Sequence, residues 1–180
     1  MEYLDVLDKD GNHTGEKKPK PDIHRDGDWH KAAHIWVVDP MGNLLIQKHS
    51  SRARGYPDMW DISSAGHISA GEDSLTAALR EVKEELSLEI KPEDLEYLFS
   101  VAQQAIFEDG AYINNEFKDV YLVELDHPPS DLKLQKEEVS ATRWIPYKKL
   151  EEIIKNGSSD FIPHPDEYPR LFAELYKRYS

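Results

Sequence analysis

The sequence predicts a mixed α/β (α+β) fold in which helices cover a mixed sheet. Three observations favour it: short apolar runs of strand length recur along the chain, turn signals separate them, and helix-like segments are interspersed. Hydrophobic residues make up 39% of the 180 residues, and there are four Trp, nine Tyr and five Phe. A chain of this length and composition can bury a core. We predict one domain over residues 1–180, with residues 1–30 as an N-terminal strand and loop extension.

The strands are predicted from apolar runs that end at turn residues. Residues 16–30 are polar and contain proline, so we expect a long loop there. A turn at residues 39–43 joins two apolar runs into a hairpin. Pro128 and Pro129 indicate another loop. Strands are predicted at residues 3–8, 34–38, 44–48, 59–63, 95–107, 116–125 and 141–145.

The clearest helix is predicted over residues 72–86. Its apolar residues recur at spacings of four, three and four, which makes a single stripe along one helix face. Two further helices are predicted at residues 147–155 and 167–179. The stripe consists of Leu75, Leu79, Val82 and Leu86.

The same helix carries a second, acidic face. Glu81, Glu84 and Glu85 are three and four residues apart, so their carboxylates emerge on one side. Clustered carboxylate oxygens are the ligands that Mg²⁺ or Mn²⁺ requires. Arg80 can relieve part of the repulsion between them. The spacing alone does not decide for a metal site, because solvated acidic helix faces are common.

The residues upstream favour the metal interpretation. Residues 66–88 read G-x5-E-x7-R-E-V-x-E-E-x-S-L, which resembles the Nudix box, G-x5-E-x7-R-E-U-x-E-E-x-G-U, where U is aliphatic. Ser87 is the one departure, because the family has a glycine there that ends the helix in a left-handed conformation. We expect that departure to weaken the helix end more than the metal site. The matching residues are Gly66, Glu72, Arg80, Glu81, Val82, Glu84, Glu85 and Leu88.

This resemblance implies a Nudix α/β/α sandwich and a Mg²⁺-dependent hydrolase that cleaves a phosphoanhydride bond in a small (nucleoside) diphosphate compound. Mn²⁺ can substitute for Mg²⁺. By similarity, the three acidic residues of the helix bind the metal together with the carbonyl of Gly66. Glu72 and Arg80 hold the loop against the helix. The general base is either a carboxylate of the box or a later residue, for which Glu138, or its neighbour Glu137, is the candidate.

Beyond the box, the chain resembles the Nudix branch that includes isopentenyl-diphosphate isomerase. The shared features are Thr14-Gly15, two spaced histidines, a basic loop and Gly66-His67. The isomerase uses a cysteine before that Gly-His pair, where this chain has Ala65, and the chain has no cysteine at all. One carboxylate of the isomerase's later pair is replaced by Asn114. We therefore favour a hydrolase and keep two alternatives, an isomerase-like enzyme and a non-catalytic Nudix-fold ligand-binding protein.

Substrate-binding candidates come from the rare basic positions of this acidic chain. Lys48, Arg52 and Arg54 surround a loop, and Lys48 and Arg54 match positions that contact diphosphate in the isomerase branch. His67 is a further substrate-binding candidate. His67 could instead form a second metal site together with His24 and His30, as their counterparts do in that branch, and the sequence leaves both possibilities open.

Charge and composition limit the possible partners. The net charge is −13 and we find no basic stripe, so no nucleic acid partner is expected. The apolar runs are too short to span a bilayer, which argues against a membrane partner. The absence of cysteine excludes disulfides and thiolate chemistry. With no signal-peptide pattern at the charged N-terminus, we expect a cytoplasmic protein with a small diphosphate substrate. A homodimer is possible, and the oligomeric state stays open.

Overall fold

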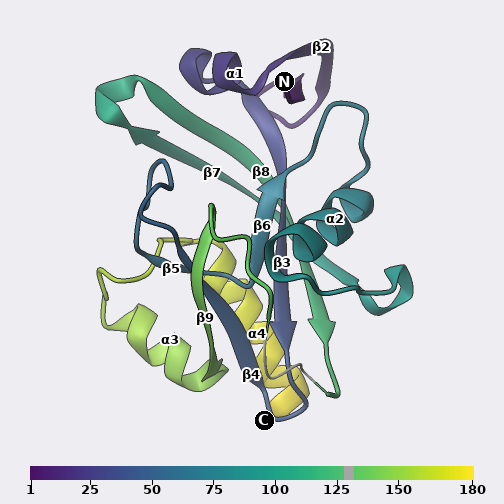
Figure 1. Ribbon diagram of the computed structural model, residues 1–180, viewed down its shortest axis with the longest axis vertical. Helices are drawn as coiled ribbons and strands as arrows, with labels where there is room; N and C mark the ends of the chain where they lie inside the picture. Colours follow the sequence, from purple (N-terminus) through teal and green to yellow (C-terminus); the bar gives the residue numbers. More distant parts are fainter. Residues whose placement is uncertain (128–131) are drawn as a thin grey trace.

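The computed structural model describes residues 1–127 and 132–180, and over these residues the chain forms a nine-stranded mixed sheet with four α-helices (Figure 1). The predicted loop at Pro128 and Pro129 lies outside the described residues. The strands are β1 (Tyr3–Leu7), β2 (His13–Pro19), β3 (Trp29–Val38), β4 (Asn43–His49), β5 (Trp60–Asp61), β6 (Ser64–His67), β7 (Glu96–Phe107), β8 (Tyr112–Glu124) and β9 (Val139–Pro146). The helices are α1 (Lys20–Asp26), α2 (Ser74–Leu86), α3 (Tyr147–Lys155) and α4 (Glu167–Tyr179), with short 3-10 turns at Pro92–Asp94 and Glu108–Gly110.

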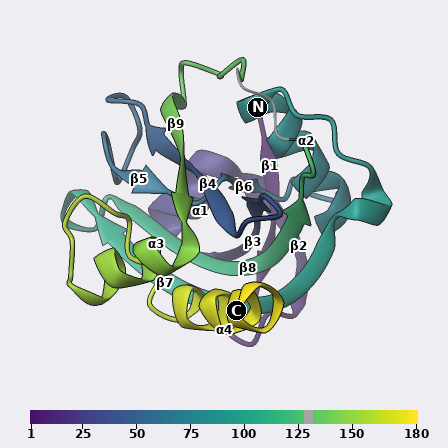
Figure 2. The same cartoon turned by 90° about the horizontal axis from the view of Figure 1, so that it is seen from below.

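Strand β3 organises the sheet. It pairs in parallel with β8 from Trp29↔Asn115 to Val38↔Glu124, and it pairs antiparallel with β1, β4 and β6. Because successive side chains of a strand point to opposite faces, β3 contributes to two cores. Trp36 packs with residues of α3 and α4, whereas Ile35 packs with residues of α2. Figure 2 shows α2 and α4 on opposite sides of β3 and β8. The α/β/α sandwich predicted from the sequence is therefore confirmed.

Most predicted elements are present. Helices α3 and α4 begin and end at the predicted residues, and α2 begins at Ser74 rather than at residue 72. Helix α2 ends at Ser87, which adopts the left-handed conformation with φ 55° and ψ 32°. Its hydroxyl donates to the Lys133 carbonyl at 2.9 Å. Serine thus occupies the position where the Nudix box has a glycine.

The long loop predicted over residues 16–30 is wrong, because β2 and α1 lie there. Strand β2 is polar and mostly exposed, yet β1 supplies its hydrogen-bonding partner, as at Asp5↔Lys17. Helix α1 has only seven residues and carries one fully buried aliphatic side chain, Ile23, which packs with Leu4 and Val6. A seven-residue helix with one apolar anchor gives no periodic signal in the sequence.

Strand β6 was also not predicted. Gly66, the first residue of the box, pairs with Ala33 of the central strand. The four residues of β6 include no large apolar side chain, so no strand pattern marks them. No helix in the described part of the chain is both long and apolar enough to cross a membrane.

Candidate active site

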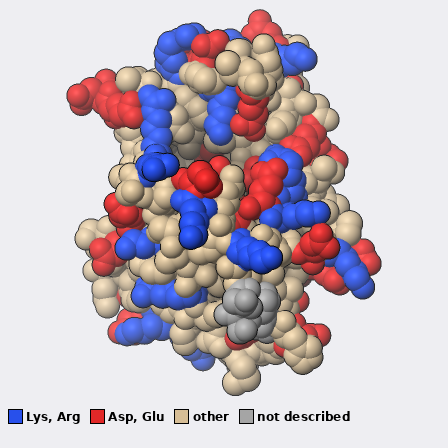
Figure 3. Space-filling view, viewed as in Figure 1, with Lys and Arg blue, Asp and Glu red and all other residues tan. Residues whose placement is uncertain are grey.

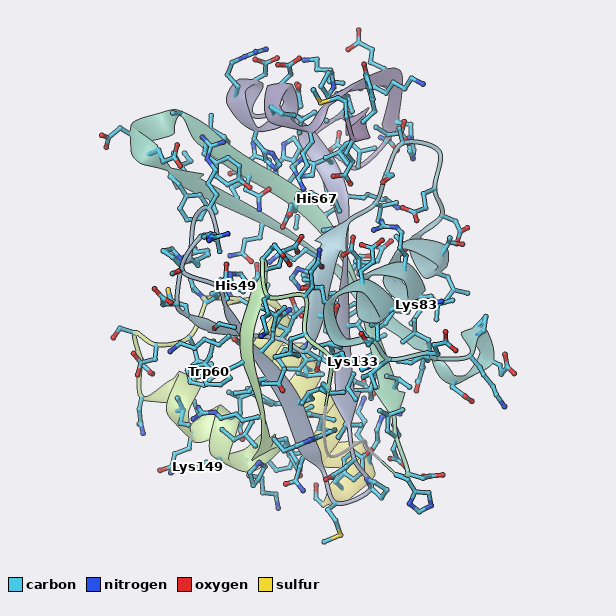
Figure 4. All side chains as sticks on the ribbon, in the orientation of Figure 1. His49, Trp60, His67, Lys83, Lys133 and Lys149 are labelled. Atoms are coloured by element: carbon cyan, nitrogen blue, oxygen red, sulfur yellow. The ribbon has the colours of Figure 1, made fainter. Side chains whose placement is uncertain are left out.

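A cavity of about 800 Å³ opens between α2, the central strands and the loop that follows β4. Its walls differ in chemistry: α2 supplies carboxylates, β3 and β6 supply histidines, and the loop supplies arginines. Figure 4 shows His67 of β6 and His49 of β4 toward the middle of the molecule, while Lys83 of α2 points to its periphery. Acidic and basic side chains are interspersed over the face of the molecule in Figure 3.

The acidic wall is built by the regular spacing of α2. Asp73 caps the helix by accepting a hydrogen bond from the Thr76 amide at 2.9 Å. Glu81 and Glu85 are buried one turn apart, and Glu84 is exposed at the rim. Burial raises the pKa of Glu81 to about 7 and that of Glu85 to about 8. A raised pKa on two neighbouring carboxyls indicates that the protein alone does not balance their negative charge.

Glu85 is held by three neutral donors. The Ser64 hydroxyl and the Ala65 amide donate to Oε1 at 2.6 and 3.0 Å, and Gln47 Nε2 donates to Oε2 at 3.1 Å. These contacts fix the orientation of the carboxylate before any ligand binds. A divalent cation would supply the positive charge that these donors lack.

Arg80 and Glu72 connect the loop before α2 to the helix. The Arg80 guanidinium donates to both oxygens of Glu72 at 2.9 Å, to the His67 carbonyl at 3.1 Å and to Glu81 Oε1 at 2.6 Å. Gly66 lies so close to Glu81 that a Cβ on Gly66 would overlap the carboxylate. This close approach places the backbone of β6 directly against the acidic wall.

Three histidines form a cluster at the cavity, which His24 and His67 line. The ligand atoms of His24, His30 and His67 all lie within 4.8 Å of one another. Glu116 Oε1 lies 3.8 Å from His30 Nε2 and 3.5 Å from His67 Nε2. Both nitrogens are buried and have no hydrogen-bond partner among the described residues. Burial lowers the pKa of His24 to about 4 and that of His67 well below its ordinary value. Imidazole nitrogens without a partner beside a carboxylate suit a divalent cation.

Two of the three basic residues that the sequence predicts to bind substrate line the cavity. Arg52 and Arg54 line the cavity. Arg54 pairs with Glu108 at 2.8 and 2.7 Å, and its guanidinium carbon lies 4.5 Å from the centre of the Tyr112 ring. Lys48 is not among the cavity-lining residues, and its Nζ lies 6.0 Å from the Trp60 ring. Its strand neighbours Gln47 and His49 line the cavity instead, because strand side chains alternate.

The comparisons with known proteins agree with this geometry. A family model described as NUDIX domain matches residues 28–164. The chain belongs to the Nudix family. Nudix hydrolase 3 of Arabidopsis thaliana is 43% identical over 98% of this chain, which spans only 24% of that protein's length. An uncharacterised Nudix hydrolase of Listeria monocytogenes is 35% identical over 91% of this chain and 90% of its own length.

The isomerase branch is also among the relatives of this Nudix hydrolase. Isopentenyl-diphosphate Delta-isomerase 2 of Photorhabdus laumondii is 31% identical over 97% of the chain and 90% of the isomerase. A crystal structure of a Deinococcus radiodurans protein superposes with a TM-score of 0.70 at 20% identity, covering 99% of this chain and all of that one. That likeness is one of fold.

The predicted base candidate lies at the rim of this Nudix site. Glu138 and Glu137 both line the cavity and both are exposed. The Ser50 amide donates to the Glu138 carbonyl at 2.9 Å, and the Ser50 hydroxyl donates to the Glu137 carbonyl at 2.7 Å. The negative charge of Glu138 contributes to the raised pKa of Glu81, so the two carboxylates interact.

The cavity floor contains a buried polar network that no sequence pattern predicted. His164 Nε2 donates to Asp61 Oδ1 at 2.6 Å, and His49 Nε2 contacts Asp61 Oδ2 at 3.0 Å. His34 Nδ1 contacts Glu167 Oε2 at 2.8 Å. The partners are as many as 133 residues apart, so no local motif connects them. The one sequence signal for this network is His34, a histidine within the apolar run of β3.

Proposed function

We propose that this Nudix hydrolase is a Mg²⁺-dependent pyrophosphohydrolase that cleaves a phosphoanhydride bond in a small, nucleoside-type diphosphate. The observation that supports this most is the pair of buried carboxyls, Glu81 and Glu85, whose raised pKa values mark uncompensated negative charge beside an open cavity. Arginines on the opposite side of the same cavity offer the donors that a phosphate requires.

The residues present fit a divalent cation. Glu81, Glu84 and Glu85 would hold it with the Gly66 carbonyl, since Gly66 and Glu81 already lie in direct proximity. When bound, the metal neutralises phosphate charge and lowers the pKa of an attacking water. Mn²⁺ offers similar chemistry.

The protein's own groups then divide the remaining work. Arg52 and Arg54 bind the phosphate oxygens, and the Glu72–Arg80 pair keeps α2 fixed against β6. Glu138 accepts the proton of the water that attacks phosphorus, and its exposed position leaves room for that exchange. The bond that breaks is the phosphoanhydride P–O bond, and the departing phosphate takes the negative charge.

A second cation position is supported by the histidine cluster. His24, His30, His67 and Glu116 would hold it, in which case His67 acts as a metal ligand rather than as a direct substrate contact. Asn114 occupies the place of the isomerase's second carboxylate and contacts His24 Nε2 through its amide oxygen at 3.2 Å. With Ala65 in place of the isomerase cysteine, no thiol is available to protonate an alkene.

The test is phosphate or nucleotide release from a panel of diphosphate compounds, assayed with Mg²⁺ and with a chelator. We expect at least one nucleoside diphosphate derivative to be cleaved, and cleavage to stop with the chelator. If isopentenyl diphosphate isomerises and nothing is hydrolysed, the isomerase alternative replaces this proposal. Ligand-induced stabilisation without any turnover would instead identify a binding protein.

A further inference from the structure

The floor of the cavity contains a buried lysine that the proposed hydrolysis does not use. Lys118 of β8 is 3% exposed and lines the cavity. Its ammonium contacts the Gln103 amide oxygen, and it lies 3.0 Å from His164 Nδ1. No carboxylate of the described residues lies within 4.0 Å of Lys118 Nζ. A buried ammonium without a contacting carboxylate is rare, because burying a charge is costly.

The network around Lys118 determines which hydrogen-bonding groups are already occupied. His164 donates through Nε2 to Asp61 Oδ1 at 2.6 Å. Because an ammonium can only donate, His164 Nδ1 accepts the hydrogen bond from Lys118 Nζ at 3.0 Å. The amide oxygen of Gln103 accepts a second hydrogen. An ammonium has three hydrogens, so one hydrogen remains for a partner in the cavity.

The neighbouring side chains do not take up the third hydrogen of the Lys118 ammonium, because they are hydrogen-bonded to other groups. Gln103 Nε2 donates to the Pro163 carbonyl at 3.0 Å, which turns the amide oxygen toward Lys118. His34 lines the same floor and is already engaged by Glu167. A hydrocarbon chain placed here would leave the ammonium without its third partner and without solvent. A hydroxyl or phosphate oxygen would complete its hydrogen bonds.

We propose that Lys118 is a substrate-specificity residue that binds an oxygen-bearing substituent of the substrate, a sugar hydroxyl or a further phosphate, outside the diphosphate that is cleaved. The substrate class is then a diphosphate with a polar, sugar-like substituent, and prenyl diphosphates are poor substrates. This inference rests on the proposed hydrolase function for its kinetic test. It concerns a residue that the box, the basic loop and the histidine cluster do not include.

The test compares wild type with Lys118→Met, which keeps an unbranched side chain close to the lysine's hydrocarbon length and removes its charge. The polar probes are ADP-ribose, UDP-glucose and 5-phosphoribosyl diphosphate, and the apolar probes are isopentenyl and geranyl diphosphate. We expect wild type to prefer a polar probe. The variant should lose about 10- to 100-fold in kcat/KM on that probe and lose little on the apolar ones.

The matched control is Lys31→Met. Lys31 is on the neighbouring strand β3, lies outside this cavity and is 3.7 Å from Asp119. Its replacement should change kcat/KM on both substrate classes by less than about twofold, as is usual for a substitution outside the site. A wild-type preference for prenyl diphosphates would overturn the proposal. So would equal losses of the Lys118 variant on both classes, or no loss on either.

A stability measurement separates this proposal from failure of the hydrolase function. If no probe is turned over, thermal stabilisation by ADP-ribose and by isopentenyl diphosphate reports binding directly. The specificity proposal then requires ADP-ribose to stabilise wild type more strongly, and Lys118→Met to abolish that difference. If Lys118→Met does not fold, Lys118→Gln takes its place, since it removes the charge but keeps a hydrogen-bond donor. The proposal then requires Lys118→Gln to reduce the difference in stabilisation between the two probes. Equal stabilisation by both probes in wild type contradicts the proposal.

Discussion

Two buried glutamates of this Nudix hydrolase show how different partners change the same side chain. Glu85 of α2 and Glu167 of α4 are 3% and 1% exposed, and each carboxylate is fully hydrogen-bonded. Burial raises the pKa of Glu85 to about 8, and its donors are neutral. Burial acts on Glu167 too, but the positive charge of His34 and its hydrogen bond lower the pKa of Glu167 to about 2. Neutral hydrogen bonds orient a carboxylate, but only a positive charge keeps it ionised in the interior.

The difference assigns the two glutamates different roles. Glu167 has its counter-charge within the protein and serves to join α4 to β3, since Trp36 Nε1 also donates to it at 2.9 Å. Glu85 has no counter-charge among its contacts, and we propose that a metal ion supplies it. The predictions below test that contrast.

The largest expected effect is on activity. Glu85→Gln keeps the shape of the side chain and removes its charge, so hydrolysis should fall by about 10³-fold, which corresponds to about 4 kcal/mol of transition-state stabilisation. Thermal stability at pH 8 should stay equal to wild type or rise, because a carboxyl with a raised pKa opposes folding once it ionises. Steady-state kinetics and a melting curve measure both quantities.

Glu89→Gln serves as the matched control, because Glu89 is exposed just beyond the end of α2. It should leave activity and stability unchanged. Retention of activity by Glu85→Gln would disprove the assignment of Glu85 as a metal ligand.

The converse variant, Glu167→Gln, should lose stability instead of catalysis. A fall in the pKa of Glu167 from 4.5 to about 2 corresponds to about 3 kcal/mol at neutral pH. Since the folded-state pKa is the lower one, this contribution is present above pH 4.5 and is lost as the pH falls toward 2. Urea titrations between pH 2 and 7 should show a steeper acid decline for wild type than for the variant. If the free energy of unfolding depends on pH in the same way in both proteins, the charge of Glu167 does not stabilise the fold and the contrast with Glu85 is wrong.

Magnesium should stabilise the protein in a pH-dependent manner. At 100 times its dissociation constant, a metal that binds only the folded state adds about 2.7 kcal/mol. Protons compete for the carboxylates, whose pKa values are about 7 for Glu81 and about 8 for Glu85. The Mg²⁺-induced rise in Tm should therefore grow from pH 6 to pH 8. Glu85→Gln should abolish most of it. A rise that is independent of pH would mean that the metal binds elsewhere.

The smallest effect is expected for a positioning residue. Gln47 is 1% exposed and orients Glu85 through its amide nitrogen. Gln47→Leu should weaken Mg²⁺ affinity and activity by about tenfold, because a residue that orients a metal ligand typically contributes that much. Saturating Mg²⁺ should restore part of the activity, which loss of a direct substrate contact would not allow. Lys48→Leu, at the next position, should have no such effect.

The sequence predicted the parts of the fold and site that are local. The spacing of apolar and acidic residues over 72–86 identified α2 and its carboxylate face, and the box related that face to Gly66 upstream. It did not identify β6, whose identity as a strand depends on pairing with β3. It misplaced Lys48, because sequence proximity to Arg52 and Arg54 does not reveal which face of β4 a side chain occupies.

The cavity floor could not be predicted for a different reason. Lys118, His164 and Asp61 come from three distant segments, and each alone is an ordinary polar residue. Their shared role arises only because His164, in the segment before α4, contacts both Asp61 of β5 and Lys118 of β8. Long-range contacts of this kind leave no periodic signal along the chain.

The register of β3 has a consequence for how the protein can tolerate change. His30 and His34 lie on one face of β3, while Ala33 and Ile35 lie on the other face and belong to the apolar core. Insertion or deletion of one residue upstream of His30, within β3, would exchange these two faces over the shifted part of the strand. Such a shift would place imidazoles in the apolar core and, at the same time, aliphatic side chains on the face that carries the histidines. Length variation among functional descendants of this protein should therefore be confined to its loops, while β3 changes only by substitution.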